Sequence, residues 1–257
     1  MAVSASQVSS LRARTGAGIL DCKKALDASA GDEEKAIAWL REKGIAKAAK
    51  KANRETSEGR IFFAEGAGKI AAVSLTCETD FVAGNDDFRG IGAELAAAAL
   101  EKGSLGEEEQ AKVTEMIARL GENSAATAEI LEVPAGGAAG FYLHSNGKLA
   151  TIIILSGSTD SALAKEIAMH ATATAPLVVA PEDLSEEGIA AERPTWEKEV
   201  EGKPEEIRGK ILAGKEAKFR AEKALLEQPF VKDPEKKIRE LLPAGAGVVE
   251  MKRLELS

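Results

Sequence analysis

Asp80 and Phe81 are neighbours in the segment "CETDFVAGND", residues 77–86. Together they place a carboxylate beside an aromatic ring in one short polar turn. The apolar run over residues 70–75 predicts a buried strand just before them. Only 4% of the chain is aromatic, so a ring in such a turn requires a reason. Either Phe81 folds back into the core, or it is held out to contact another molecule. The second reading predicts binding chemistry, with an apolar group and a negative charge offered together.

Residue spacing offers little support for an enzyme. His144 and His170 stand alone, without Cys, His or Glu at metal-ligand spacing. No phosphate-binding loop of the Gly-x-x-x-x-Gly-Lys-Ser/Thr type is found, and no Ser or Cys lies at triad spacing from a His. By elimination the sequence favours a binding protein that is not an enzyme and needs no cofactor, metal or directly bound nucleotide.

Charge and composition limit the partners that we expect. The net charge of −8 argues against bulk binding to nucleic acid or to a membrane surface. A basic tract, Lys47–Arg54, leaves RNA binding open as an alternative, although no aromatic residue is interleaved to stack bases. No stretch is apolar enough to cross a membrane, the start has no targeting pattern, and two distant cysteines suit a reducing compartment. We therefore expect a cytoplasmic location.

The elements that must position the turn begin with helices. Apolar residues at helical spacing predict three short helices within residues 1–54, separated by Gly-rich turns. The expected buried face of the second helix, residues 19–28, comprises Ile19, Cys22, Ala25 and Leu26. A charged linker follows.

Two later segments repeat one pattern, "GKIAAVSLTCETD" from Gly68 and "GKLATIIILSGSTD" from Gly147. An extended run precedes each and an Ala-rich stretch follows, which predicts a β-hairpin and then a helix in both halves. The helices are expected near residues 88–100 and 162–173, with another near 107–120. The second copy has no aromatic residue at the position of Phe81, so closing this kind of turn does not require a ring. The comparison favours a role for Phe81 outside its own half.

The rest of the chain predicts a helical hairpin and a closing strand. Two charged helices joined by "EGKP" form the hairpin, with Pro194 interrupting the first arm. Residues 228–242 predict a further helix, and residues 247–257 an edge strand. The expected fold is α+β, with a small three-helix N-terminal bundle, a duplicated α+β core with antiparallel sheets, and a protruding helical hairpin. The expected domains are residues 1–54 (the bundle and the start of the basic linker), 55–139 (the N-terminal core half), 140–180 with 225–257 (the C-terminal core half), and 181–224 (the hairpin).

Several segments resemble one protein family over essentially the whole chain. "LRARTGAGILDCKKAL", residues 11–26, and "CETDFVAGND" resemble the two signatures of the elongation factor Ts family. "LGEN" at 120–123, "IAMH" at 167–170 and "QPFVKD" at 228–233 match in the same order. Members are guanine-nucleotide exchange factors for the GTPase elongation factor Tu in translation elongation, a step of protein biosynthesis.

The resemblance implies a ubiquitin-associated type of N-terminal domain, a coiled-coil hairpin, and a role for the opening turn. In the family this turn, here Thr79-Asp80-Phe81 with Val82, enters the GTPase near its magnesium and nucleotide site. A buried aromatic contributes about 1.5–3 kcal/mol, enough to prop apart two elements of a partner. A carboxylate near the magnesium can compete for its ligands. The alternative left open is an adaptor that binds a protein without affecting nucleotide exchange.

Other positions match the family one at a time. By this match Arg12, Ile19, Leu20 and Lys23 touch the GTPase domain, Leu120 and Gly121 form a loop beside the turn, and His144 faces the partner's other domains. Ile19 and Leu20 could instead belong to the bundle core, and His144 could be an ordinary edge-strand histidine.

The chain also departs from the family pattern. Ile19-Leu20 stand where members often carry two bulky residues such as Met-Met. The hairpin is the candidate surface for a homodimer, but Pro194 and its short length argue against coiled-coil pairing. Many members continue into a further C-terminal helix that touches the GTPase, and we expect that contact to be missing because the sequence ends at Ser257.

Overall fold

The computed structural model describes residues 3–257 and divides the chain into two compact units. The first unit runs to Ile130 and includes Leu256–Ser257, and the second comprises Leu131–Glu255. Both units combine helices with antiparallel strands, which confirms the α+β class. The finer division into four domains remains a prediction.

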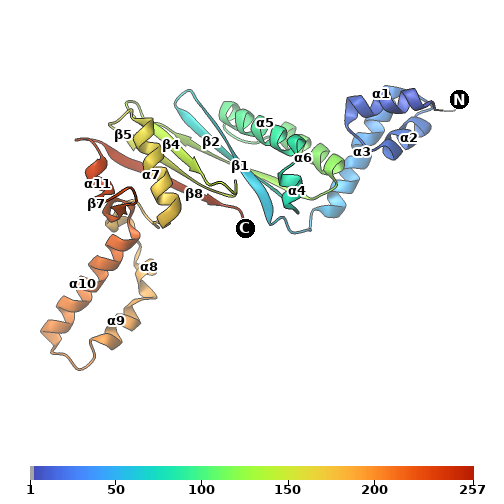
Figure 1. Ribbon diagram of the computed structural model, residues 1–257. Helices are drawn as coiled ribbons and strands as arrows, with labels where there is room; N and C mark the ends of the chain where they lie inside the picture. Colours follow the sequence, from blue (N-terminus) through green and yellow to red (C-terminus); the bar gives the residue numbers. More distant parts are fainter. Residues whose placement is uncertain (1–2) are drawn as a thin grey trace. The chain divides into compact units, whose positions relative to one another are not determined.

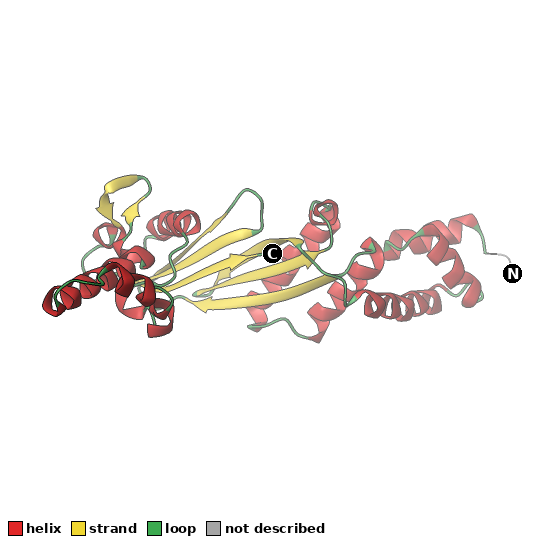
Figure 2. Cartoon of the chain, turned by 90° about the horizontal axis from the view of Figure 1, so that it is seen from below, coloured by secondary structure: helices red, strands yellow, loops and turns green. Residues whose placement is uncertain are grey.

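The first unit begins with three helices and no strand (Figure 2). They are α1 (Ala5–Thr15), α2 (Ile19–Ala28) and α3 (Glu33–Lys51). Side chains of Ser4 and Asp32 cap the amide ends of α1 and α3, and Gly16 ends α1 in the left-handed conformation. Helix α3 extends through the first part of the predicted linker.

Leu11, Cys22, Ala25, Leu26 and Ala36 form the core of this bundle. The prediction that Ile19 shares the buried face of α2 is wrong, because its side chain is 56% exposed. Ile19 is the first residue of α2, so it precedes the turns of the helix that pack against α1 and α3.

A three-stranded antiparallel sheet and covering helices complete the first unit (Figure 1). The strands, in the order β1-β2-β3, are β1 (Glu58–Gly66), β2 (Lys69–Cys77) and β3 (Ser124–Glu132). The helices are α4 (Asp80–Ala83), α5 (Asp86–Lys102) and α6 (Glu107–Leu120). Helix α5 packs on β1 and β2, burying Phe88 and Leu95, while α6 packs against α3. Strand β3 was not predicted, although its alternating burial is the pattern of a half-covered strand.

The second unit repeats the arrangement of hairpin and covering helix. Its sheet has the order β4-β5-β8, with β4 (Ala138–Leu143), β5 (Leu149–Ser156) and β8 (Gly247–Glu255). Helix α7 (Ser161–Thr174) lies on β4 and β5 (Figure 1). It approaches β4 so closely that a Cβ at Gly140 would lie 2.3 Å from the backbone nitrogen of Lys165. Both hairpin-helix predictions and the closing edge strand are confirmed.

The hairpin in the second unit has one broken arm and one continuous arm. Its elements are the 3-10 turn η1 (Pro181–Asp183), α8 (Glu186–Ala190), α9 (Arg193–Glu199) and α10 (Glu205–Lys223). The break before α9 confirms the expected interruption near Pro194. Trp196 of α9 packs edge-on against Phe219 of α10, with ring centroids 5.5 Å apart.

The helix predicted over residues 228–242 is wrong. The structure has the 3-10 turn η2 (Leu225–Glu227), a small hairpin of β6 (Pro229–Phe230) and β7 (Asp233–Lys237), and a single helical turn, α11 (Ile238–Leu241). Pro229 and Pro234 lack the amide hydrogen of a continuing helix and disfavour helical geometry in the residue before them. In addition, the Gln228 side chain lies 3.0 Å from the buried His170 imidazole.

Candidate partner-binding site

The opening turn is a single helical turn, α4, between β2 and α5. Thr79 is its N-cap, with the Val82 amide donating to its hydroxyl at 3.4 Å. The Gly84 amide donates back to the Asp80 carbonyl at 2.8 Å and closes the turn. Helix α5 then starts anew, because Asn85 accepts a hydrogen bond from the Asp87 amide.

This short helix has an anchored side and an uncovered side. Ala83 is buried and Val82 packs against the core of the first unit. Phe81 is 85% exposed, the highest value among the exposed large hydrophobic residues of the described chain. Asp80 is also exposed, and its carboxylate forms no hydrogen bond or ion pair with the residues that the structure describes. The prediction that the ring stands outward is confirmed.

A carboxylate from a distant segment fixes the start of α4. Glu122 Oε1 accepts the hydroxyl proton of Thr79 at 2.6 Å. Its other oxygen, Oε2, accepts the backbone amides of Thr79 at 2.9 Å and of Glu78 at 3.1 Å. Glu122 lies in the loop after α6, so these three bonds join two loops that are far apart in the sequence. Sequence reasoning singled out Leu120 and Gly121 in this loop and missed Glu122, although "LGEN" contains it.

The return contacts run from the first loop to the second. Glu78 Oε1 accepts the Asn123 amide at 2.7 Å and lies 3.4 Å from Arg54. The Asn123 side chain in turn donates to the Arg54 carbonyl at 2.7 Å. At the far end of α4, the guanidinium of Arg60 donates to the Ala83 carbonyl at 3.1 Å. Both ends of the turn are therefore fixed, while its central ring is free.

The titratable groups beneath the turn reflect this arrangement. The hydrogen bond from the Asn123 amide, with the charge of Arg54 nearby, holds the pKa of Glu78 below its ordinary value. Burial raises the pKa of the Cys77 thiol to about 11, and the negative charge of Glu122 acts in the same direction. Cys77 donates to the Thr79 carbonyl at 3.1 Å. It is therefore a neutral thiol at ordinary pH, and its hydrogen bond helps to hold the residue that precedes α4.

The predicted residues of the N-terminal bundle lie on its surface. Arg12 and Lys23 are exposed, as are Ile19 and Leu20, the last at 73%. The reading of Ile19 and Leu20 as bundle core is therefore wrong. The bundle therefore exposes two adjacent aliphatic side chains and two cations, and their role in partner binding stays a prediction.

The remaining predicted residues have structural surroundings of their own. Leu120 packs partly against the core, and Gly121, at φ 84°, ends α6 in the left-handed conformation that glycine adopts without strain. His144 belongs to the second unit, where it is exposed in the β4–β5 connection with its ring centroid 6.4 Å from that of Tyr142. The structure brings Leu120 and Gly121 near the turn through Glu122.

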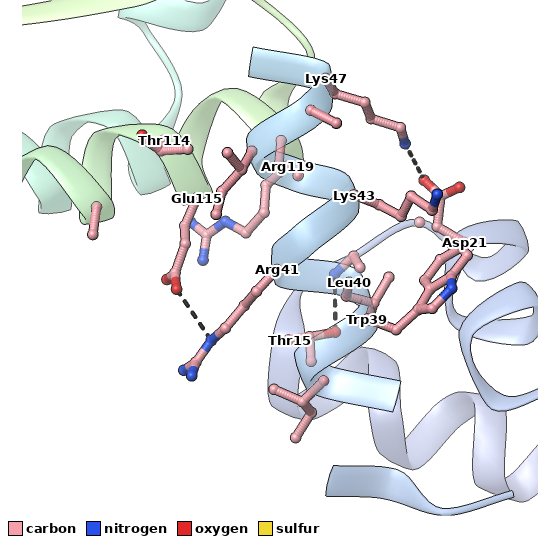
Figure 3. A pocket seen from close by; sticks show the side chains of 18 of the residues that line it. Thr15, Asp21, Trp39, Leu40, Arg41, Lys43, Lys47, Thr114, Glu115 and Arg119 are labelled. Carbon is pink, nitrogen blue, oxygen red and sulfur yellow. Dashed lines mark hydrogen bonds and ion pairs between the residues drawn. The ribbon is translucent and has the colours of Figure 1, made fainter. Parts of the chain in front are cut away.

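The described chain also has a cleft between the N-terminal bundle and α6 (Figure 3). Trp39 and Leu40 contribute apolar surface, and the ion pairs Lys47–Asp21 and Arg41–Glu115, at 2.8 and 3.4 Å, lie along it. None of the predicted partner-binding residues lines this cleft. Among residues 3–257, no group of three or more His, Cys, Asp or Glu side chains is arranged to hold a metal ion. No helix in the same range has the length and hydropathy needed to span a bilayer.

Comparison with known proteins gives a consistent result. A family model described as "Elongation factor TS" matches residues 78–257. Two curated relatives named Elongation factor Ts, from Nitratidesulfovibrio vulgaris strains DP4 and Hildenborough, are each 42% identical over 256 residues. The matches cover 94% of this chain and 89% of each relative.

Proposed function

This chain belongs to the elongation factor Ts family, and we propose that it is the guanine-nucleotide exchange factor of the translation GTPase elongation factor Tu. The observation that carries the finer mechanism is the geometry of α4, where an unpaired carboxylate and an 85% exposed aromatic ring stand on a turn fixed at both ends. In this proposal the turn enters the GTPase beside its magnesium and nucleotide site and weakens the hold on GDP.

The ring of Phe81 supplies the apolar part of that action. Its exposed surface is nearly that of a free side chain, so almost all of the gain from burial is available to a partner. Full burial of a phenylalanine contributes about 1.5–3 kcal/mol. If the pocket for the ring forms only when two elements of the GTPase separate, the ring favours the separated state by up to this amount.

The carboxylate of Asp80 supplies the charged part. It has no partner among the described residues, so no ion pair within this chain must break before it turns toward a cation. A carboxylate that approaches the magnesium site competes for the ligands or waters of the ion.

Exchange then follows from reciprocal coupling between two ligands of one GTPase. If this chain lowers the affinity for GDP by some factor, GDP lowers the affinity for this chain by the same factor. The chain accelerates release and leaves the overall nucleotide equilibrium unchanged. It acts as a binding protein in the cytoplasm and binds no nucleotide itself.

The exposed face of Arg12, Ile19, Leu20 and Lys23 provides a second contact that would hold the GTPase while the turn acts. His144, on the second unit, is assigned to the other domains of the partner. A homodimer through the hairpin is not needed for this mechanism.

The test is release of labelled GDP from elongation factor Tu by substoichiometric amounts of the chain. We expect the wild type to accelerate release, and Phe81→Ala to lose most of the effect while its circular dichroism is unchanged. Complex formation by the wild type with no change in GDP release would instead support the adaptor alternative. A Phe81→Ala variant that is fully active would refute the role of the ring.

A further inference from the structure

Resting on the proposed exchange function, we infer that Glu122 is a positioning residue for the exchange turn. Its carboxylate holds Thr79 in the N-cap geometry from which α4 presents Asp80 and Phe81 before any partner arrives. Glu122 is half-buried and both of its carboxylate oxygens are bound by Glu78 and Thr79, so in this proposal it acts through Thr79 and not by touching the GTPase.

The contacts of this carboxylate are specific to that task. Both of its oxygens are used, and all three donors belong to the two residues that precede α4. The 2.6 Å bond from the Thr79 hydroxyl is in the range of charge-assisted hydrogen bonds. The same hydroxyl also accepts the Val82 amide, so the orientation that Glu122 imposes on it is the one that caps the helix.

The loop that carries Glu122 is itself held in place. Gly121 turns the chain at the end of α6, and Lys51 donates to the Gly121 carbonyl. The Asn123 amide is bound by Glu78, so each loop supplies a carboxylate to amides of the other. A carboxylate at this position is therefore presented from a rigid support, as positioning requires.

Helix α4 has only four residues, too few to be stable by itself. Without Glu122, the start of α4 keeps the local cap by Thr79, the bond from Cys77 and the contacts of Glu78, but it loses three hydrogen bonds, including the one that orients the Thr79 hydroxyl. The anchors at Val82 and Ala83 and the bond from Arg60 lie at the other end. We expect the turn to sample several conformations, only some of which direct Phe81 outward, and the productive fraction to fall.

The experiment measures GDP release as a function of the concentration of the chain. Glu122→Ala is expected to lower the maximal release rate roughly tenfold, while the half-saturating concentration changes less than about twofold, because the bundle surface still binds. Glu122→Gln is expected to be intermediate, since its carbonyl oxygen still accepts amide protons. Glu115→Ala, which removes another paired carboxylate from the same unit, is the control and should match the wild type.

Two further measurements separate positioning from general damage. Hydrogen exchange of a peptide containing Glu78 and Thr79 should be faster in Glu122→Ala, while exchange in β2 stays close to the wild type. Glu122→Ala should cost less in a Phe81→Ala background than in the wild type, because the ring that Glu122 positions is already absent and only the positioning of Asp80 remains to be lost. A further loss in the double variant, additive with the first, would overturn the inference.

The outcomes distinguish the two proposals. If the wild type does not accelerate GDP release, the proposed function and this inference both fail. If the wild type is active and Phe81→Ala is not, but Glu122→Ala retains full activity, only the inference fails. Should Glu122→Ala be unfolded by circular dichroism, Glu122→Gln carries the test, and full activity with unchanged amide exchange at Thr79 would overturn it.

Discussion

Substitution by alanine should affect protein stability very differently at two aromatic residues of one short segment. Phe81 is 85% exposed in α4, whereas Phe88, one helix later, is fully buried beneath the first sheet. We expect Phe81→Ala to leave the stability of the first unit nearly unchanged and Phe88→Ala to reduce it severely.

The magnitudes follow from these exposures. About 15% of the Phe81 surface leaves water on folding, which corresponds to only about 0.2–0.5 kcal/mol of burial. The higher helix propensity of alanine offsets part of that loss, so the net change should lie within about 0.5 kcal/mol. Truncating Phe88 removes a fully buried ring that lies 6.3 Å from the Phe62 ring. Substitutions of this kind cost about 3–5 kcal/mol, including the cavity that remains.

Cys77 provides a local probe for this measurement. The thiol is buried in the same core as Phe88, and burial raises its pKa to about 11, so it should react with an alkylating reagent only when the core opens. Brief alkylation across a urea series, with the Cys77 peptide identified by mass spectrometry, gives the stability of the first unit separately from that of the second. If Phe81→Ala shifts the urea midpoint as far as Phe88→Ala does, the Phe81 ring belongs to the core, and the proposal that it enters a partner is refuted.

Two further predictions concern the second unit. Gly140→Ala should destabilise it by about 1–3 kcal/mol in calorimetry, because the new methyl group would meet backbone atoms of α7. The control is Gly209→Ala on the open face of α10, which should stabilise its helix by up to about 1 kcal/mol. Equal effects of the two substitutions would contradict the close approach of α7 to Gly140. Burial lowers the pKa of His170, so its contribution to stability is present above its unfolded pKa of about 6.5 and is lost as pH falls toward the folded value. The free energy of unfolding of the second unit should therefore fall between pH 7 and 5, by at most about 1.4 kcal/mol per pH unit from this group, and the melting temperature should fall with it. Both changes should be smaller in His170→Gln.

Much of the fold could be predicted because local pattern and tertiary packing agree. The apolar runs Ile70–Leu75 and Ala150–Leu155 form the central strands β2 and β5 of the two sheets. In these strands nearly every side chain is buried, so the apolar pattern in the sequence matches the packing. The end of α6 at Gly121 coincides with its left-handed conformation. In contrast, residues 228–242 have helical composition, but two prolines and the hydrogen bond of Gln228 to His170 decide their conformation.

The sequence predicted the exposed residues of the candidate site but not the residue that holds them in place. Phe81 was identifiable because aromatic residues are rare and the second copy lacks one. Glu122 could not be identified in the same way, because charged residues are common in this chain and nothing in the sequence pattern distinguishes this glutamate from the others. Its role depends on a turn of the chain at Gly121 that brings it to Thr79, and such a contact between distant segments is visible only in three dimensions.

A comparison of the two repeated halves indicates that the whole turn α4, and not only the Phe81 ring, is an addition to the common pattern. In the second half, Asp160 follows β5 and caps α7 directly, accepting the Leu163 amide at 3.0 Å. In the first half, the equivalent Asp80 does not cap the long helix. The chain makes the additional turn α4, and Asn85 caps α5 instead. Connecting a strand to its covering helix therefore does not require α4, and the core gains only the contacts of Val82 and Ala83 from it. Two distant side chains, Glu122 and Arg60, nevertheless fix this turn, and its largest side chain is left uncovered. Packing within the unit explains the anchors and not the exposed ring, and this supports the proposal that the whole inserted turn, and not Phe81 alone, contacts the partner.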